Sequence, residues 1–250
     1  MKEQIHTIPV NEAFETADEC PFCHLERQVE QHAIRYVLGP AASYMEPDVR
    51  VATDKAGFCR EHSKKMYDFG NTLGNALILQ TYYARLLEEF HYDAAAFEMP
   101  PKQPLIGKRK PDGKERLWQQ LQQKVESCYI CDKIEYNMSR YFETFFVLLR
   151  DAEFRSKVEG TKGFCMRHFA RLLQEAEEHL PNGQREWFYK TVFPLMEENL
   201  IRVKDDLDWL VAKFDYRNAG ADWKNSKDAL ARTMQKLEGI YVADPPYKDK

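Results

Sequence analysis

Apolar residues recur three and four positions apart through most of this chain, which is the period of an amphipathic α-helix. One such stripe begins at Leu73, and its later members are Ala76, Leu77, Tyr83, Leu86, Leu87 and Phe90. Similar stripes follow Ile130 as far as Leu149 and run from Val192 to Phe214. We find no segment with the two-residue alternation of a half-buried strand. The pattern therefore predicts an all-α fold, with the stripes facing its core.

A proline-rich connector interrupts the helical pattern near the middle of the chain. Four of the twelve prolines fall between Pro100 and Pro111, so we expect a linker over residues 100–113. It would separate a helical repeat over 1–99 from a second one over 114–250 that carries a C-terminal helical extension. The basic residues of this region are Lys108, Arg109, Lys110, Lys114 and Arg116. We interpret them as a solvated linker, with nucleic-acid contact as the alternative.

The overall charge and composition exclude several functional classes. The net charge is −4 with both signs interspersed, which argues against nucleic acid or an anionic membrane surface as the partner. An apolar content of 44% is enough for a packed core. No uncharged apolar window is long enough for a membrane span. Residues 1–19 lack the basic head and apolar core of a signal peptide, so we expect a cytoplasmic location.

All six cysteines belong to one pattern that occurs twice. The spacing is C-x2-C-x35-C-x2-H in the first half and C-x2-C-x33-C-x2-H in the second. The residues concerned are Cys20, Cys23, Cys59 and His62, and then Cys128, Cys131, Cys165 and His168. Gly-Phe-Cys also recurs at the third ligand of each set. The sequence therefore predicts two diverged repeats, each stapled by a Cys3His metal site.

The positions of these residues suggest how each pair of ligands is presented. Pro21 suits the first turn of a helix, which would place Cys23 close to Cys20. Cys59 and His62 are also three residues apart, at the start of a helical pattern. We therefore expect two helix starts to meet at one metal ion within each half of the chain. Three thiolates and one imidazole favour zinc, two ions per chain, in closed structural sites.

Other uses of the same ligands remain open. A Cys3His set can hold an iron–sulfur cluster, which would make the chain a redox protein or enzyme. Cys20 and Cys23 resemble a thioredoxin-like redox dithiol, although no βαβ context is visible. A metal sensor or delivery protein would have two sites of unequal affinity. No recognisable catalytic motif is present, so the sequence favours a scaffold or interaction protein with an unidentified protein partner.

A polar and aromatic cluster near the C-terminus is a further candidate site. It consists of Asp215, Tyr216, Arg217 and Asn218, directly after a predicted amphipathic helix. Such a cluster can bind a ligand or partner. It can also cap the helix and dock the terminal segment through an Asp–Arg pair and asparagine hydrogen bonds, and we favour this interpretation.

The repeated C-x2-C and Gly-Phe-Cys-x2-His motifs, together with the segment from Lys213 to Asn218, resemble a family of uncharacterised bacterial proteins found mainly in Firmicutes. The similarity spans most of the chain, and the duplicated cysteine motif is its most specific part. The resemblance implies no established activity. Some family members carry a transporter-component label, with which the N-terminus of this chain does not agree.

Overall fold

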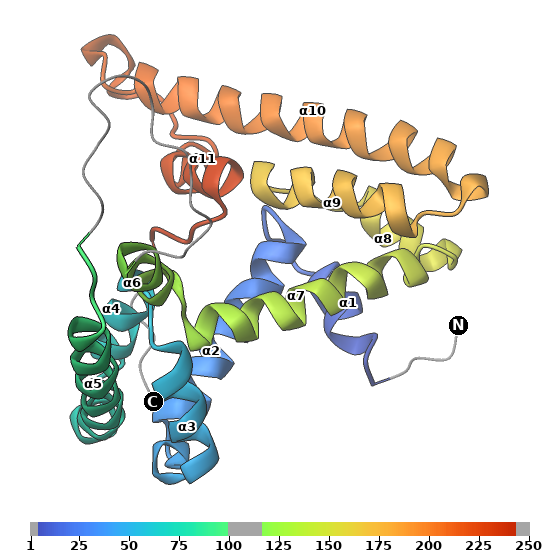
Figure 1. Cartoon of the computed structure of the whole chain (residues 1–250). Helices are drawn as coiled ribbons and strands as arrows, with labels where there is room; N and C mark the ends of the chain where they lie inside the picture. The colour runs from blue at the N-terminus through green and yellow to red at the C-terminus, as the bar shows by residue number, and fades with distance from the viewer. Residues whose placement is uncertain (1–4, 100–116, 244–250) are drawn as a thin grey trace, which may run out of the picture. The chain divides into compact units, whose positions relative to one another are not determined.

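The computed structural model describes residues 5–99 and 117–243, and helices are the only regular elements in these ranges (Figure 1). The all-α fold is therefore confirmed. The helices of the first part are α1 (Ile8–Ala13), α2 (Pro21–Leu38), η1 (Ser43–Met45), α3 (Pro47–Ala56), α4 (Arg60–Phe69) and α5 (Thr72–Ala95). Those of the second part are α6 (Leu117–Glu126), α7 (Tyr129–Leu148), α8 (Ala152–Glu159), α9 (Met166–His179), α10 (Asn182–Ala212), η2 (Tyr216–Asn218) and α11 (Ala229–Glu238). The predicted linker over 100–113 and the basic cluster at 108–116 lie outside the described residues.

The described residues form two compact units, and each unit draws on both halves of the sequence. Unit 1 contains residues 5–29 and 135–243, and unit 2 contains residues 30–99 and 117–134. The division between them falls inside α2 and inside α7 rather than in the region of the predicted linker. The units therefore differ from the expected pair of consecutive repeats.

Unit 1 is built around a cluster of phenylalanine side chains. Phe22, between the first two cysteines, is completely buried and stacks on Phe142 of α7 with ring centroids 4.1 Å apart. Phe164, from the second Gly-Phe-Cys motif, lies 5.8 Å from Phe22. Aromatic side chains of this size dominate the energetics of a core. The cluster thus joins the first ligand segment to residues that follow it by more than a hundred positions.

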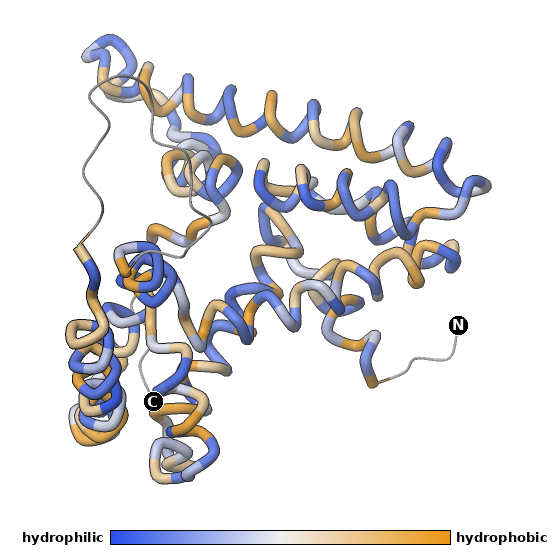
Figure 2. Tube along the Cα trace, viewed as in Figure 1, coloured by the Kyte–Doolittle hydropathy of each residue, from blue (hydrophilic) through white to orange (hydrophobic). Residues whose placement is uncertain are grey.

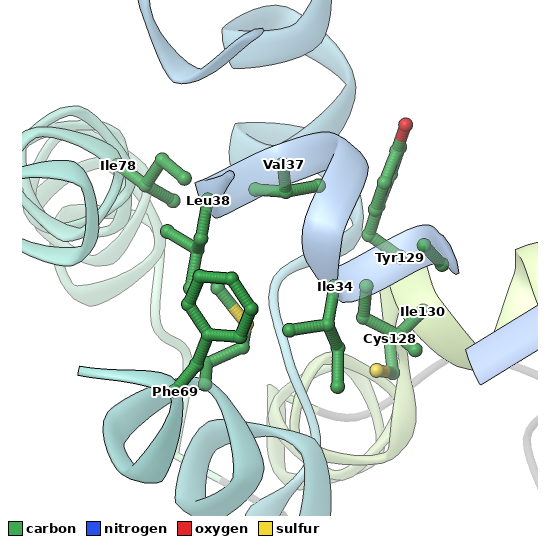
Figure 3. Packing of buried hydrophobic residues seen from close by; sticks show 10 residues of the cluster. Ile34, Val37, Leu38, Phe69, Ile78, Cys128, Tyr129 and Ile130 are labelled. Atoms are coloured by element: carbon green, nitrogen blue, oxygen red, sulfur yellow. The ribbon is translucent and has the colours of Figure 1, made fainter. Parts of the chain in front are cut away.

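The core of unit 2 is aliphatic and also joins distant segments. The side chains of Ile34 and Val37 from α2 pack with Cys128, Tyr129 and Ile130 at the start of α7 (Figure 3). Phe69 of α4 and Ile78 of α5 close the cluster. A backbone hydrogen bond of 2.9 Å from Tyr129 N–H to the carbonyl of Gly57 also joins the start of α7 to the connection between α3 and α4.

The apolar stripe of α5 is only partly buried, which corrects the expectation that it faces a core. Gly74 and Ile78 are buried, whereas Tyr83, Leu87 and Phe90 are 51–61% exposed. Apolar residues nevertheless continue along this helix (Figure 2). A difference in length contributes, because α5 has 24 residues and α3, which packs on it, has 10. At 1.5 Å per residue, α5 is longer by about 20 Å.

Candidate metal centres

The eight predicted ligands form two groups, but not the groups expected from their order in the chain. Site 1 consists of Cys20, Cys23, Cys165 and His168. Site 2 consists of Cys59, His62, Cys128 and Cys131. In each group the four ligand atoms lie within 4.8 Å of one another. The prediction that each repeat holds its own metal is therefore wrong, because each C-x2-C pair meets the Cys-x2-His pair of the other half.

Core packing explains this exchange of ligand pairs. Phe22 lies inside the first C-x2-C motif and packs in the aromatic cluster with Phe164, next to Cys165. Cys128 packs beside Ile34 in the core of unit 2, which also contacts Phe58 and Cys59. The residues between and beside the ligands thus decide which pairs meet, and burial of large apolar side chains supplies the free energy.

Every ligand pair lies at the start of a helix, as the sequence predicted. Cys20 directly precedes α2, and Cys128 directly precedes α7. Cys59 and Cys165 are the N-cap residues of α4 and α9. At the start of α9, the Cys165 Sγ accepts a hydrogen bond from the backbone N–H of His168 at 3.4 Å. Residues at an N-cap and three positions later lie near each other, so each helix presents two ligands to one point.

The glycine of each Gly-Phe-Cys motif has a backbone conformation that other residues rarely adopt. Gly57 has φ of 63° and Gly163 has φ of 76°. A Cβ atom at Gly57 would also lie only 2.8 Å from the hydroxyl oxygen of Tyr82. These two glycines turn the chain into the ligand-bearing helices, which explains why the motif includes glycine.

The distances between ligand atoms match a tetrahedral ion with thiolate and imidazole ligands. In site 1 the three sulfurs lie 3.3–3.6 Å from His168 Nδ1. In site 2 they lie 3.2–3.3 Å from His62 Nδ1, and Sγ of Cys59 is 3.9 Å from Sγ of Cys131. Zinc bonds of about 2.3 Å to sulfur and about 2.0 Å to nitrogen, at tetrahedral angles, place S and N about 3.5 Å apart and two sulfurs about 3.8 Å apart. Both groups therefore fit one such ion.

Carboxylates orient both histidines. His62 Nε2 lies 2.9 Å from Glu30 Oε1, and both side chains are at least 90% buried. His168 Nε2 lies 3.5 Å from Glu26 Oε2, and the Glu26 carboxylate also pairs with Arg167. In each histidine the Nε2 side faces a carboxylate and Nδ1 faces the sulfurs. This is the arrangement that fixes the tautomer and the orientation of a metal-bound histidine.

The three thiols of site 1 cannot all ionise without a compensating positive charge. Burial raises the pKa of Cys20, and hydrogen bonds with Cys165 and Cys20 raise the pKa of Cys23. Hydrogen bonds from Cys20 and Cys23 hold the pKa of Cys165 far below its ordinary value. Three sulfurs packed together inside a core thus favour one thiolate and disfavour the others. A divalent cation removes this conflict because it stabilises all three thiolates.

In site 2 the pKa shifts of His62 and Cys128 favour a thiolate–imidazolium pair when no metal is bound. Burial alone would lower the pKa of His62, but hydrogen bonds with Cys128 and Glu30 outweigh burial and raise the pKa to about 10. Burial likewise opposes ionisation of Cys128, yet its hydrogen bond with His62 lowers the Cys128 pKa to about 6. Burial and the neighbouring Cys128 raise the pKa of Cys131. A metal ion that binds here must therefore displace protons from His62 and Cys131.

Helix α11 closes site 1. It packs on α9 and α10 (Figure 1), and its Lys236 side chain is 2% exposed. The Lys236 ammonium donates hydrogen bonds to the carbonyls of Glu19 and Lys162, which precede the two ligand pairs of the site. Asp18 accepts hydrogen bonds from Gln235 at 2.6 Å and from the Tyr241 hydroxyl at 2.8 Å. The C-terminal segment thus ties both ligand-bearing segments together.

The tail cluster contains the contacts of a helix cap. Asn218 Nδ2 donates to the carbonyl of Ala212 at 2.9 Å, and Asp215 pairs with Arg217. Lys213, just before the cluster, donates to the carbonyls of residues 218, 219 and 221. Tyr216 is 86% exposed and remains the cluster member most open to a partner. These contacts agree with the helix-capping part of the favoured interpretation, while docking of the terminal segment by this cluster and a ligand-binding role stay predictions.

Sequence reasoning missed the residues that support the ligands. Glu26 and Glu30 follow Cys23 by three and seven positions, so both lie on the cysteine-bearing face of α2. This spacing could have been used to predict that the two carboxylates lie close to the metal ligands. Lys236 and Tyr241 carried no comparable signal, because they lie far from the ligands in the chain and only the fold brings them together.

The comparisons with known proteins agree with the resemblance seen in the motifs. The chain is 24% identical over 205 residues to an uncharacterised 23.9 kDa protein in the xynA 3′ region of Caldicellulosiruptor sp. (strain Rt8B.4). The aligned residues cover 80% of this chain and 85% of that protein. No solved structure matches the chain. In the described part of the chain, no helix combines the length and apolar character that crossing a bilayer requires. The sequence profile of DUF6062, a family of unknown function, matches residues 1–244, and the chain belongs to this family.

Proposed function

We propose that this is a zinc protein of the cytoplasm, in which two Cys3His sites hold structural ions and the helical surface serves an interaction partner. The observation that carries the proposal is the spacing of the ligand atoms, which in both sites is that of one tetrahedral ion. Each ion would connect residues from both halves of the chain. Structural zinc contributes roughly 10 to 16 kcal/mol in small peptides at neutral pH, which is comparable to the net stability of a domain.

The spacing and burial of the ligand atoms also argue against an iron–sulfur cluster and against a redox dithiol. Ligands of a multinuclear iron–sulfur cluster bind different iron atoms and therefore stand further apart than ligands that share one ion. Separations of 3.2–3.9 Å thus favour a single ion over a cluster. A dithiol that exchanges with partner thiols needs accessible sulfurs. Cys20 and Cys23 are at most 1% exposed, which argues against that use of the first C-x2-C motif.

Elemental analysis with a visible spectrum tests the proposal. Protein purified with and without oxygen, with no added metal or chelator, should contain two zinc ions per chain and be colourless. Iron with sulfide in the anaerobic sample would overturn the proposal and favour a redox protein. One iron per site without sulfide would retain the mononuclear geometry but replace zinc.

Pairs of substitutions test which ligands share an ion. Cys23→Ser with Cys165→Ser should remove one zinc ion, because both ligands belong to site 1. Cys23→Ser with Cys59→Ser should remove both ions. Loss of both ions in the first variant and of one ion in the second would instead show that the ligands pair within each repeat. The proposed duplication of one ancestral unit is supported by the matching order of elements, since each half has a C-x2-C helix, a short helix and a Gly-Phe-Cys-x2-His helix.

A further inference from the structure

The two sites differ in how far their ligands are open to solvent. All four ligands of site 1 are buried, and none of Cys20, Cys23, Cys165 and His168 is more than 3% exposed. In site 2, His62 and Cys128 are buried, Cys59 is half-buried and Cys131 is exposed. Site 2 therefore has one buried side and one side that solvent can reach.

The backbone after α11 covers the sulfurs of site 1. Gly239 follows α11 with φ of 77°, and a Cβ atom placed there would lie 3.2 Å from Cys23 Sγ and 3.3 Å from Cys165 Sγ. The main chain thus passes directly over two of the three sulfurs. An incoming donor atom could reach an ion in site 1 only if this segment moved away, which would break the Lys236 and Tyr241 hydrogen bonds.

Neighbouring residues hold the two buried ligands of site 2, His62 and Cys128, through contacts that do not involve Cys131. Glu30 holds His62 through its Nε2 atom, and Lys65 in turn donates to Glu30 at 2.6 Å. Cys128 lies within the aliphatic core of unit 2, as Figure 3 shows. These contacts would retain two ligands while Cys131 is replaced by another donor.

From this asymmetry we infer that site 2 is an exchangeable metal site, which passes its ion to thiol or amine donors through replacement of Cys131, while site 1 keeps its ion. The inference rests on the two-zinc protein of the proposed function and deepens it, because site 1 keeps its structural role whereas the ion of site 2 can also be passed on. An incoming thiol or ammonium would lose its proton as its sulfur or nitrogen replaces Cys131 Sγ on the ion, and the released Cys131 thiolate would take up one proton in exchange through solvent. No electron is transferred, so the ion remains divalent.

A chromophoric chelator measures the exchange directly. Protein shown by elemental analysis to hold two zinc ions is mixed with excess 4-(2-pyridylazo)resorcinol, and zinc release is followed by absorbance. We expect two phases of one equivalent each, with rates at least tenfold apart. Lys236→Met should accelerate the slow phase and leave the fast phase unchanged, because Lys236 donates to the carbonyls of Glu19 and Lys162, which precede the ligand pairs of site 1. A single phase of two equivalents would overturn the inference.

Alkylation of the unmodified sequence identifies the fast site without a ligand substitution. Iodoacetamide is added to the two-zinc protein after the fast phase, and the labelled cysteines are identified by peptide mass spectrometry. Label on Cys131, Cys59 and Cys128 is expected, with Cys20, Cys23 and Cys165 protected. Label on the site 1 cysteines would overturn the inference. Failure of the protein to hold two ions, even after loading with zinc chloride, would instead overturn the proposed function.

Discussion

At the residue scale, each metal site includes a carboxylate that contacts its histidine, in addition to the four ligands. Glu30 is 8% exposed and contacts the Nε2 side of His62, so its charge acts on the ring that would bind the ion. Such outer partners typically change metal affinity by 10–100-fold when they are replaced. Their role can be separated from structural effects because a glutamine retains the size and an acceptor oxygen.

Glu30→Gln should weaken zinc binding at site 2 by about tenfold and leave site 1 unchanged. The reason is that glutamine lacks the negative charge that increases the basicity of His62. Competition against a chelator of known affinity measures the change. Glu61→Gln on α4 is the matched control, because its side chain is 71% exposed and pairs only with Lys65 among the ion pairs described. Equal effects of the two substitutions would contradict the role assigned to Glu30.

Zinc binding at site 2 should also depend steeply on pH. His62, with a pKa of about 10, and Cys131, with a raised pKa, both carry protons at neutral pH in the metal-free protein. Each proton that zinc displaces makes the affinity tenfold stronger per unit increase in pH, so these two protons alone give at least about 100-fold between pH 7 and 8. Acid therefore favours metal loss. Calorimetric titrations in buffers of different protonation enthalpy count the protons, and a count below two would contradict these pKa shifts.

At the element scale, the sequence allowed the starts of the ligand-bearing helices to be predicted, but not which of these helices meet at one metal site. Pro21 after Cys20, and the spacing of Cys59 and His62, indicated helix N-termini that the structure contains. The choice of partner depends on whether Phe22 packs with Phe164 or with Phe58, and both follow a glycine in the same motif. No local pattern separates these alternatives. The exposure of the apolar face of α5 could not be predicted either. The periodicity of a sequence indicates that a helix has an apolar face, but not how long the helix is that packs on this face.

Helix α11 offers a test of how an element far from the ligands stabilises a site. Lys236→Met should destabilise unit 1 by about 3 kcal/mol, because it leaves the buried carbonyl of Glu19 and the part-buried carbonyl of Lys162 without their charged donor and removes a partner of the buried Glu19 side chain. Chemical denaturation of the zinc-loaded protein measures this loss. Lys227→Met, in the exposed loop before α11, should change stability by less than about 0.5 kcal/mol. Similar effects of both substitutions would contradict the stabilising role assigned to Lys236.

At the scale of the whole molecule, the exchange of ligand pairs makes each half of the chain depend on the other. Residues 1–99 contain Cys20, Cys23, Cys59 and His62, which is a full set of four ligands by number. In the structure, two of them belong to site 1 and two to site 2. Phe22 and Ile34, which lie in the same half, also pack against residues of the second half. Neither half therefore contains a complete metal site or a complete core.

This dependence predicts the behaviour of the separated halves. A fragment of residues 1–99 should bind zinc weakly and lack a cooperative thermal transition, and a fragment of residues 114–250 should behave in the same way. Mixing the two with zinc should restore helical circular dichroism and two tightly held ions together, because each site needs one ligand pair from each fragment. A 1–99 fragment that folds alone around one ion would instead show that its four ligands can form a site within one repeat. Cys165→Ser in the second fragment provides the control, since the mixture should then recover site 2 and only one ion.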